Sequence, residues 1–400
     1  MNCRQTSPNP DGTLMTPRQP RTAPTRAAEP PAERPAYDLA DAHLLPTPEP
    51  IQLVTPEGSP VADPRLPMPD TDTLVRAHDL MVQGRRFNDQ AHALVRQGRL
   101  AVYPSSHGQE ACQVAAAMVL EDQDWLVPTY RDTVAAMVKG VDPVQILLLL
   151  AGDWHAGYDP YAHCCAPTAT PLATQLVHAA GVGYAARVKG ERTVVVAMCG
   201  DGATSEGDFH EALNFAAVFK APVIFLVQNN EFAISVPLSR QTAAPSLAAK
   251  AIGYGMPGKR VDGNDVAALL AVLGEAVDRA RAGEGPTLVE AHTYRMQAHT
   301  NADDATRYRS SEAVKEWEPR DPILRSQAHL LSLGAIDDEH ATALTQRVEE
   351  MAAEMRLGMS AERELDPTVL FDHVFATPTP QLREQRAQLL DELAREEAAK

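Results

Sequence analysis

The sequence has no apolar run long enough to cross a membrane. Its most apolar stretch, residues 144–151, is far shorter than the roughly 20 residues that a membrane-spanning helix needs. The apolar segment of a signal peptide is also missing near the N-terminus. Cysteine is scarce: there are five, an odd number without a CxxC pair, which favours a reducing compartment over a disulfide framework. We therefore expect a cytoplasmic protein, with the mitochondrial matrix as the alternative.

Positive charge is also in short supply. The chain has 36 Lys and Arg residues against 53 Asp and Glu, which gives a net charge of −17 at pH 7. Nucleic acids and anionic membranes bind to basic surfaces, so we expect neither as a partner. A local basic pocket for a phosphate group is still compatible with this overall charge.

Proline is distributed unevenly and divides the chain. Half of the 32 prolines fall within residues 1–70. Because proline removes a backbone donor and interrupts helices, we expect a largely disordered or extended leader over 1–70, in which residues 51–58 form a small hairpin against the domain. Arginines in this leader would suit an organelle transit peptide, whereas its prolines and acidic residues argue against one. One domain then occupies 71–376, followed by a charged helix over 377–400.

The domain alternates between helical patterns and buried strands. Residues 193–199 and 221–227 are continuous apolar runs rich in β-branched residues, the pattern of strands that are buried on both faces. A helix is expected between them over 206–219, which makes a βαβ unit. Further helices are expected over 72–97, 107–120, 171–189 and 265–282, and a further strand over 287–291. The expected fold class is α/β, with a parallel sheet and helices on both faces.

A polar motif follows each of the two buried strands. Gly200-Asp201-Gly202 follows the first, and Asn229-Asn230 follows the second. Ligands of open parallel sheets bind at the carboxyl ends of the strands, where glycine lets backbone amides approach a phosphate and the next helix points its positive end. Carboxylate and amide oxygens are ligands that Mg²⁺ prefers. These residues predict a metal–diphosphate site, with a helix cap at Asp201 and a plain turn at the Asn pair as the structural alternatives.

The two motifs have a familiar spacing. GDG, 26 residues and then NN resembles the diphosphate-binding motif of thiamine-diphosphate enzymes. The longer string GDGATSEGDFHEALNFAAVFKAPVIFLVQNNEFAIS is similar to the alpha subunit of the first, decarboxylating component of 2-oxo acid dehydrogenase complexes. Further matching blocks are QGRLAVYPSSHGQEA, VPTYRD, PLATQ, RVDGND and YRMQAHTNADDATRYRS. The resemblance runs from about residue 51 to about residue 392 and implies a thiamine-diphosphate-binding fold.

The resemblance implies roles for individual residues. Thiamine diphosphate and Mg²⁺ would be the cofactors, and Mg²⁺ would be held by Asp201, Asn230 and the carbonyl of Phe232. Cofactor contacts are also implied for Tyr130, Arg131, Leu172, Gly202, Ala203, Gln228 and His299. Of these, His299 matches the active-site histidine that supports acyl transfer to the lipoyl group.

The chain departs from the family pattern at a few positions. Some branched-chain members carry Arg where this chain has Gln228, which would weaken one phosphate contact. Some members also bind potassium: Pro171, Thr174 and Gln175 match that site, but Ala169 replaces its serine, which argues against potassium. The acidic pair Asp303-Asp304, in the block that contains His299, is expected on a solvated loop face or paired with Arg307 and Arg309.

The resemblance also implies partners and a reaction. The glutamate that activates the cofactor lies on a separate beta subunit in this family, so we expect an α2β2 heterotetramer that acts with a lipoyl-bearing dihydrolipoyl transacylase. The expected reaction is oxidative decarboxylation of a branched-chain 2-oxo acid such as 2-oxoisovalerate, with pyruvate as the main alternative and acetoin dehydrogenase as a lesser one. A non-catalytic scaffold subunit is the alternative of another class, and the presence of Asp201, Asn230 and His299 argues against it.

Overall fold

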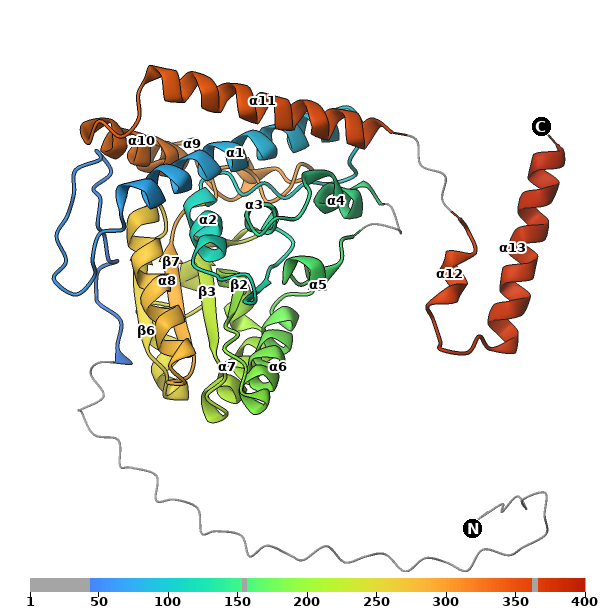
Figure 1. Ribbon diagram of the computed structural model, residues 1–400, viewed down its shortest axis with the longest axis horizontal. Helices are drawn as coiled ribbons and strands as arrows, with labels where there is room; N and C mark the ends of the chain where they lie inside the picture. Colours follow the sequence, from blue (N-terminus) through green and yellow to red (C-terminus); the bar gives the residue numbers. More distant parts are fainter. Residues whose placement is uncertain (1–43, 153–156, 362–365, 400) are drawn as a thin grey trace, which may run out of the picture. The chain divides into compact units, whose positions relative to one another are not determined.

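The computed structural model describes residues 44–152, 157–361 and 366–399. The first 43 residues of the expected leader lie outside these ranges. A parallel sheet with the strand order β1-β2-β3-β7-β6 organises the domain (Figure 1). Its strands are β1 Trp125–Val127, β2 Val195–Gly200, β3 Val223–Asn229, β6 Gly258–Asp262 and β7 Thr287–His292. The fold class expected from the sequence is confirmed.

The expected βαβ unit is present and places both polar motifs at one edge of the sheet. It consists of β2, helix α7 (Gly207–Val218) and β3. The parallel register pairs Gly200 with Gln228, so the two strands end side by side. Asp201 therefore emerges next to the Asn229-Asn230 pair, as the continuous apolar runs predicted.

Side chains that alternate along the strands build two hydrophobic cores. Val196 and Met198 of β2 point into one core, whereas Val195 and Ala197 point into the other. The first core is covered by α1 (Thr71–Arg96), α2 (Glu110–Met118), α3 (Thr133–Val138) and α8 (Val266–Arg281), and the second by α6 (Thr174–Lys189) and α7. The expectation of helices on both faces is thus confirmed. The other α-helices of the described residues are α4 Pro143–Leu148, α5 Pro160–His163, α9 Ser311–Trp317, α10 Pro322–Ser332, α11 Asp338–Ser360, α12 Val369–Asp372 and α13 Pro380–Ala398.

Two expected helices begin three residues later than the sequence pattern suggested. Helix α2 starts at Glu110, because Gly108 has a left-handed backbone with φ +93 that no helix can include. Helix α6 starts at Thr174, because Ala173 is left-handed with φ 65. The residues before these two helices form irregular turns near the carboxyl edge of the sheet, close to the polar motifs.

The small hairpin expected around residues 51–58 packs against the domain. The small hairpin is present, with an antiparallel bridge between Val54 and Pro60, but its chain also forms a parallel bridge from Ile51 to Val261 of β6. Leu53 is 1% exposed. Residues 51–66 therefore belong to the packed domain, because distant segments supply the apolar and polar partners that the prolines cannot supply locally.

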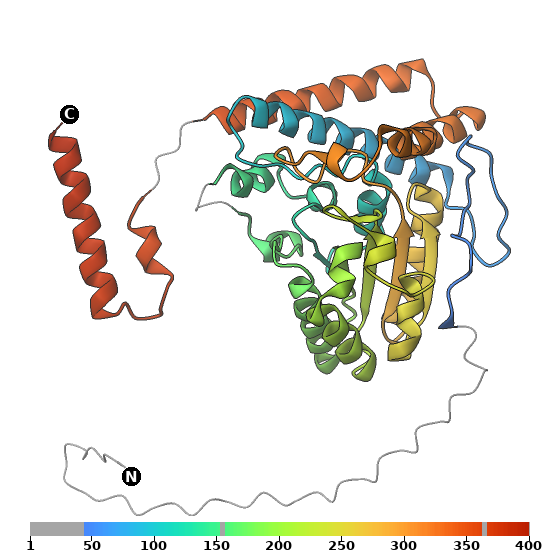
Figure 2. The ribbon, with the colours of Figure 1, turned by 180° about the vertical axis from the view of Figure 1, so that it is seen from behind.

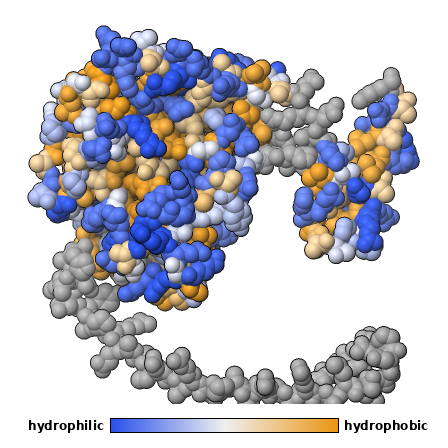
Figure 3. All heavy atoms as spheres, viewed as in Figure 1, coloured by the Kyte–Doolittle hydropathy of each residue, from blue (hydrophilic) through white to orange (hydrophobic). Residues whose placement is uncertain are grey.

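Long helices lie on one side of this domain. Figures 1 and 2 show α11 running alongside α1, and contacts between the two helices agree with both views. Helix α13 follows later in the chain and has no buried residue. Its surface shows both hydrophilic and hydrophobic residues in Figure 3. Within the described ranges, no helix is both long and apolar enough to cross a membrane.

Candidate functional site

A cavity of about 660 Å³ opens at the carboxyl ends of β2 and β3. Every residue that the resemblance implied for the cofactor or for Mg²⁺ lines this cavity: Tyr130, Arg131, Leu172, Asp201, Gly202, Ala203, Gln228, Asn230, Phe232 and His299. These residues come from five separate stretches of the chain. The fold therefore brings together the residues that the sequence blocks indicated one by one.

Asp201 lies in the 3-10 turn between β2 and α7 and is 1% exposed. Its Oδ2 atom accepts a hydrogen bond of 2.6 Å from the Gln241 amide. Burial raises the pKa of the Asp201 carboxyl, and this hydrogen bond opposes the rise. The side chain does not cap the following helix, because no capping bond is present at the start of α7. A buried carboxylate with an amide as its main partner is well suited to meet a cation.

Gly202 follows Asp201 and approaches the β4–β5 hairpin (Phe232–Ala233 and Val236–Pro237) closely. A Cβ atom on Gly202 would lie 2.7 Å from the Cβ of Ala233, which is closer than side chains tolerate. Glu231 and Ile234, which flank the first hairpin strand, both have positive φ, at 70° and 53°. The tight turn around Phe232 therefore requires glycine opposite it, and its strained backbone is typical of a functional site.

Asn230 and Phe232 present their oxygens from this turn. Asn230 Oδ1 accepts a hydrogen bond from the backbone N–H of Phe232 at 3.4 Å. The Phe232 carbonyl accepts a bond of 3.1 Å from Arg295, whose guanidinium also donates to the carbonyl of Ile234 and to the hydroxyl of Tyr308. A carbonyl oxygen has two lone pairs, so Phe232 keeps capacity for a second contact.

Arg131 and His299 lie against each other in the cavity wall. Arg131 Nη2 is 3.0 Å from His299 Nδ1, and Arg131 Nη1 donates to the carbonyls of Ser105 and His299. Burial and the charges of Arg131 and Arg295 lower the pKa of His299 to about 4. The imidazole is therefore neutral near pH 7, and since Arg131 donates to Nδ1, the proton is on Nε2.

The backbone of the His299 loop is held by Asp303. Asp303 Oδ2 accepts from the His299 N–H at 2.9 Å and from the Tyr308 hydroxyl at 2.5 Å. Asp303 is only partly buried, and its carboxylate closes the loop instead of pairing with Arg307 or Arg309. Asp304 is exposed, as expected for a solvated loop face, and caps the short turn that follows by accepting from Thr306 N–H.

Gln228 is buried and fixed by a residue that the sequence had not singled out. Its Nε2 atom donates to Asp132 Oδ1 at 2.7 Å, while its Oε1 atom has no hydrogen-bond partner within the described residues. Burial raises the pKa of the Asp132 carboxyl to about 6. Gln228 therefore offers the cavity an acceptor and not a donor.

Sequence reasoning also missed other polar residues of the cavity lining, among them Gln109, Gln241 and Arg295. Gln109 lies in the block QGRLAVYPSSHGQEA and Arg295 in the block YRMQAHTNADDATRYRS, so the matching strings marked both segments. A polar side chain within such a block shows its role only when its partner is known, and the Gln109–Asn230 and Gln241–Asp201 contacts join residues 121 and 40 positions apart.

The residues expected near a potassium ion lie outside the cavity lining. The Thr174 hydroxyl donates to Asp208 Oδ2 at 2.9 Å, and the Gln175 amide donates to the carbonyl of Met198 at 2.8 Å. In the described part of the chain, no group of three His, Cys, Asp or Glu side chains could hold a metal ion.

Residues 78–367 match the family described as dehydrogenase E1 component. The chain belongs to this family. A relative, the 3-methyl-2-oxobutanoate dehydrogenase subunit alpha of Mycobacterium tuberculosis (strain ATCC 25618 / H37Rv), is 49% identical over 349 residues, which cover 87% of this chain and 95% of the relative. The pyruvate dehydrogenase E1 component subunit alpha of Staphylococcus aureus (strain N315) is 40% identical over 300 residues, covering 75% and 81%. The family membership implies thiamine diphosphate as the cofactor and confirms the resemblance.

Proposed function

We propose that this chain is the alpha subunit of a 2-oxo acid dehydrogenase that acts on branched-chain substrates such as 3-methyl-2-oxobutanoate. The observation that carries this proposal is the 49% identity over 95% of the length of the M. tuberculosis subunit. Pyruvate is the second candidate substrate, supported by the 40% identity to the S. aureus subunit. The apolar residues Val102, Pro104 and Leu150 in the cavity wall suit a branched acyl group.

The residues of the cavity fit thiamine diphosphate with Mg²⁺. Asp201, Asn230 and the Phe232 carbonyl would supply three oxygens, and the diphosphate would supply others, which satisfies the preference of Mg²⁺ for oxygen ligands. Two unpartnered buried atoms, Gln109 Nε2 and Gln228 Oε1, support a polar occupant. Thiamine diphosphate held by these residues would supply the electron sink that decarboxylation of a 2-oxo acid needs.

Backbone amides and two side chains would orient the diphosphate. Gly202 and Ala203 begin the turn that leads into α7, whose N-terminal end favours an anion. Arg131 supplies positive charge, and Tyr130 packs edge-on against His299 with ring centroids 6.1 Å apart. Gln228 would not contact the phosphates, because its amide nitrogen donates to Asp132 and its amide oxygen would repel an anion.

The chain would not bind potassium beside this site, because Ala169 supplies no side-chain oxygen.

His299 would donate from its neutral imidazole. Its Nδ1 atom accepts from Arg131, so Nε2–H is the group available to a bound phosphate or to the acyl acceptor. Arg131 holds the ring of this residue, and Asp303 holds its backbone N–H. We assign His299 a part in the transfer of the acyl group to the lipoyl group of the transacylase.

A beta subunit would complete the site. Leu172, Ile234 and Val236 line the cavity but are 43%, 54% and 41% exposed, so apolar wall is open to water on this side. A second chain that covers these residues would exclude water and bring the glutamate that activates the cofactor. Leu172 would then press against the bound cofactor instead of facing solvent.

Activity of the co-expressed alpha and beta chains tests this proposal. With thiamine diphosphate and Mg²⁺ present, we expect decarboxylation of 3-methyl-2-oxobutanoate to exceed that of pyruvate, and we expect neither reaction from the alpha chain alone. A preference for pyruvate would overturn the substrate but keep the mechanism. An assembled heterotetramer without any cofactor-dependent decarboxylation would favour a scaffold role and overturn the proposal.

A further inference from the structure

Gln109 occupies a position in which its side chain has no local role. It precedes the first residue of α2 and is fully buried. Residues at this position usually cap the helix by accepting a hydrogen bond from one of its first N–H groups. The Gln109 side chain makes no such bond. It is directed into the cavity, where it lies beside Asn230, the residue that follows β3.

The amide of Gln109 contacts the amide of Asn230. Asn230 Nδ2 donates to Gln109 Oε1 at 3.2 Å, and this bond is buried. Asn230 is therefore held at both ends of its amide: Nδ2 meets Gln109, and Oδ1 accepts from Phe232 N–H at 3.4 Å. Gln109 Nε2 has no hydrogen-bond partner in the part of the chain that the structure describes. This donor is left for an oxygen of whatever occupies the cavity.

The second contact of Asn230 decides the direction of the amide–amide bond. If both amides were reversed, Gln109 Nε2 would donate to Asn230 Oδ1 and the distance between the two side chains would stay the same. Asn230 Nδ2 would then face the N–H of Phe232, and two donors would oppose each other. The arrangement with Asn230 Oδ1 beside Phe232 is therefore the favourable one.

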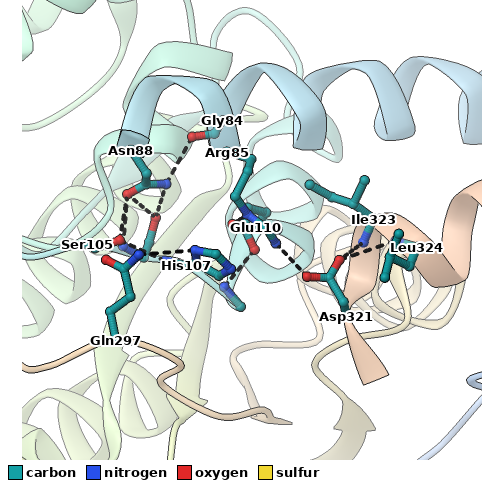
Figure 4. A network of polar contacts seen from close by, with 12 residues as sticks. Gly84, Arg85, Asn88, Ser105, His107, Glu110, Gln297, Asp321, Ile323 and Leu324 are labelled. Atoms are coloured by element: carbon teal, nitrogen blue, oxygen red, sulfur yellow. Dashed lines mark hydrogen bonds and ion pairs between the residues drawn. The ribbon is translucent and has the colours of Figure 1, made fainter. Parts of the chain in front are cut away.

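The loop that carries Gln109 is anchored on two sides (Figure 4). Glu110 accepts from Arg85 at 2.5 Å and from the N–H of Gly108 at 2.8 Å, and Arg85 also donates to Asp321 at 2.9 Å. These contacts join the loop to α1 and to the start of α10. A side chain on such a fixed backbone can hold its neighbour in one orientation.

Asn88 of α1 anchors the other end of the same loop. Its Oδ1 atom accepts from the Tyr103 hydroxyl at 2.7 Å and from the Ser106 N–H at 3.0 Å, while its Nδ2 donates to the Gly84 carbonyl at 2.9 Å. Figure 4 shows Asn88 with its contacts to Gly84 and Ser105, one helical turn from Arg85 on the same helix. Gln109 is therefore preorganised before any ligand binds.

We propose that Gln109 is a positioning residue of the metal site, which holds the Asn230 amide so that its oxygen, and not its nitrogen, is presented to the metal ion. This inference rests on the proposed function, which assigns Mg²⁺ to Asp201 and Asn230. Without Gln109, the 3.4 Å contact with Phe232 N–H is left to orient the Asn230 amide, and the reversed orientation places a donor against the cation. The role is distinct from that of Asp201 and Phe232, which would contact the metal themselves.

Calorimetric titration of the metal-free heterotetramer with Mg²⁺, in the presence of thiamine diphosphate, tests the proposal. Loss of an outer partner of a metal ligand typically weakens metal affinity by about 10–100-fold, so we expect Gln109→Leu to raise the Kd for Mg²⁺ at least about tenfold. Gln109→Glu keeps an oxygen for Asn230 Nδ2 and should stay closer to the wild type. Gln90→Leu is the matched control, because Gln90 is also buried with an unpartnered Nε2 but lies on α1, outside the cavity lining.

A double-mutant cycle with Asn230→Asp distinguishes a loss of Asn230 orientation from a general disruption of the cavity. A carboxylate presents an oxygen in either orientation, so Gln109→Leu should cost little Mg²⁺ affinity in the Asn230→Asp background. An equal loss in both backgrounds, or wild-type affinity in Gln109→Leu, would overturn the positioning role. If Gln109→Leu does not assemble, Gln109→Met takes its place in the same cycle. Absence of Mg²⁺ binding by the wild type would overturn the proposed function and this inference together.

Discussion

Asp132 accepts hydrogen bonds from two donors at once, one of which is the side chain of Gln228. Gln228 Nε2 lies 2.7 Å from Asp132 Oδ1, and Thr129 N–H donates to Asp132 Oδ2 at 2.9 Å. An ionised carboxylate satisfies both donors, whereas a protonated one would turn a hydroxyl towards one of them. Burial nevertheless disfavours the charge, and the resulting pKa of about 6 reflects this opposition.

The raised pKa of Asp132 predicts a dependence of stability on pH. The protonated carboxyl is favoured in the folded chain, so its contribution to stability is fully present below the ordinary aspartate pKa of 3.8 and is lost as the pH rises through about 6. The quantity to compare is the difference in melting temperature between the wild type and Asp132→Asn. We expect the advantage of the wild type to be larger at about pH 5 than at about pH 7.5. Differential scanning fluorimetry of the assembled enzyme measures this difference, and an equal value at both pH values would contradict the shift.

Substitution of Gly202 should damage cofactor binding through a steric contact. In Gly202→Ala the new Cβ would lie 2.7 Å from the Ala233 Cβ, so the turn that carries Asp201 must move. We expect thiamine-diphosphate affinity to fall about tenfold or more, as found for small displacements at preorganised sites. Gly207→Ala is the matched control, because nothing lies within 4 Å of its added Cβ. Ala233→Gly should partly restore Gly202→Ala, and failure of both comparisons would remove the steric argument.

His299→Ala should separate the two halves of the reaction. The side chain takes part in contacts from Arg131 and Arg295, but the Asp303 carboxylate holds only its backbone, so the loop should keep its fold. We expect decarboxylation with an artificial electron acceptor to persist and acylation of a lipoyl domain to fall about 100-fold or more, the range for loss of a positioned proton-transfer group. Each half is measured separately by rapid-quench kinetics. Unchanged lipoyl acylation would exclude His299 from this step.

Removal of Arg325 should weaken the attachment of residues 51–66. Its guanidinium donates to the Val54 carbonyl and lies 2.9 Å from Asp262 and 3.4 Å from Asp265, and Asp265 is almost fully buried. Because Arg325→Met leaves a buried carboxylate without its cation, we expect a loss of about 3 kcal/mol in the free energy of unfolding. Urea denaturation followed by circular dichroism measures it.

The control for Arg325 is an exposed ion pair. Arg279 meets Glu284 at 2.8 Å, and the Glu284 side chain is largely in solvent. Arg279→Met should therefore cost no more than about 1 kcal/mol. Similar losses in both variants would mean that the buried Arg325 contacts do not anchor the hairpin.

The sheet and its edge were predictable because their signal is local. The continuous apolar runs at 193–199 and 221–227 correspond to β2 and β3, with shifts of one or two residues. A strand buried on both faces needs such a run, and the first polar residues after it must lie at the carboxyl edge. The position of Asp201 and Asn230 at this edge was therefore predictable from the sequence alone. The family blocks then indicated the cavity residues that lie on other loops.

The remaining features depend on contacts between distant segments. Gln109 and Asn230 are 121 residues apart, and Gln228 and Asp132 are 96 apart. Nothing in either local sequence indicates which buried amide will meet which partner. The same limit applies to the leader, where proline content predicted an extended chain but the acceptors for the Leu53 and Val54 N–H groups come from Asp265, more than 200 residues later.

The open wall formed by Leu172, Ile234 and Val236 has a consequence for the cell. An alpha chain that has not met its beta chain would present this apolar rim to other proteins, and exposed apolar patches promote aggregation. Alpha chains made in excess would therefore aggregate and would not raise the amount of assembled enzyme. Cells that make this protein should gain from producing the two chains in equal numbers and close together, so that each alpha chain finds its beta chain before it finds another alpha chain.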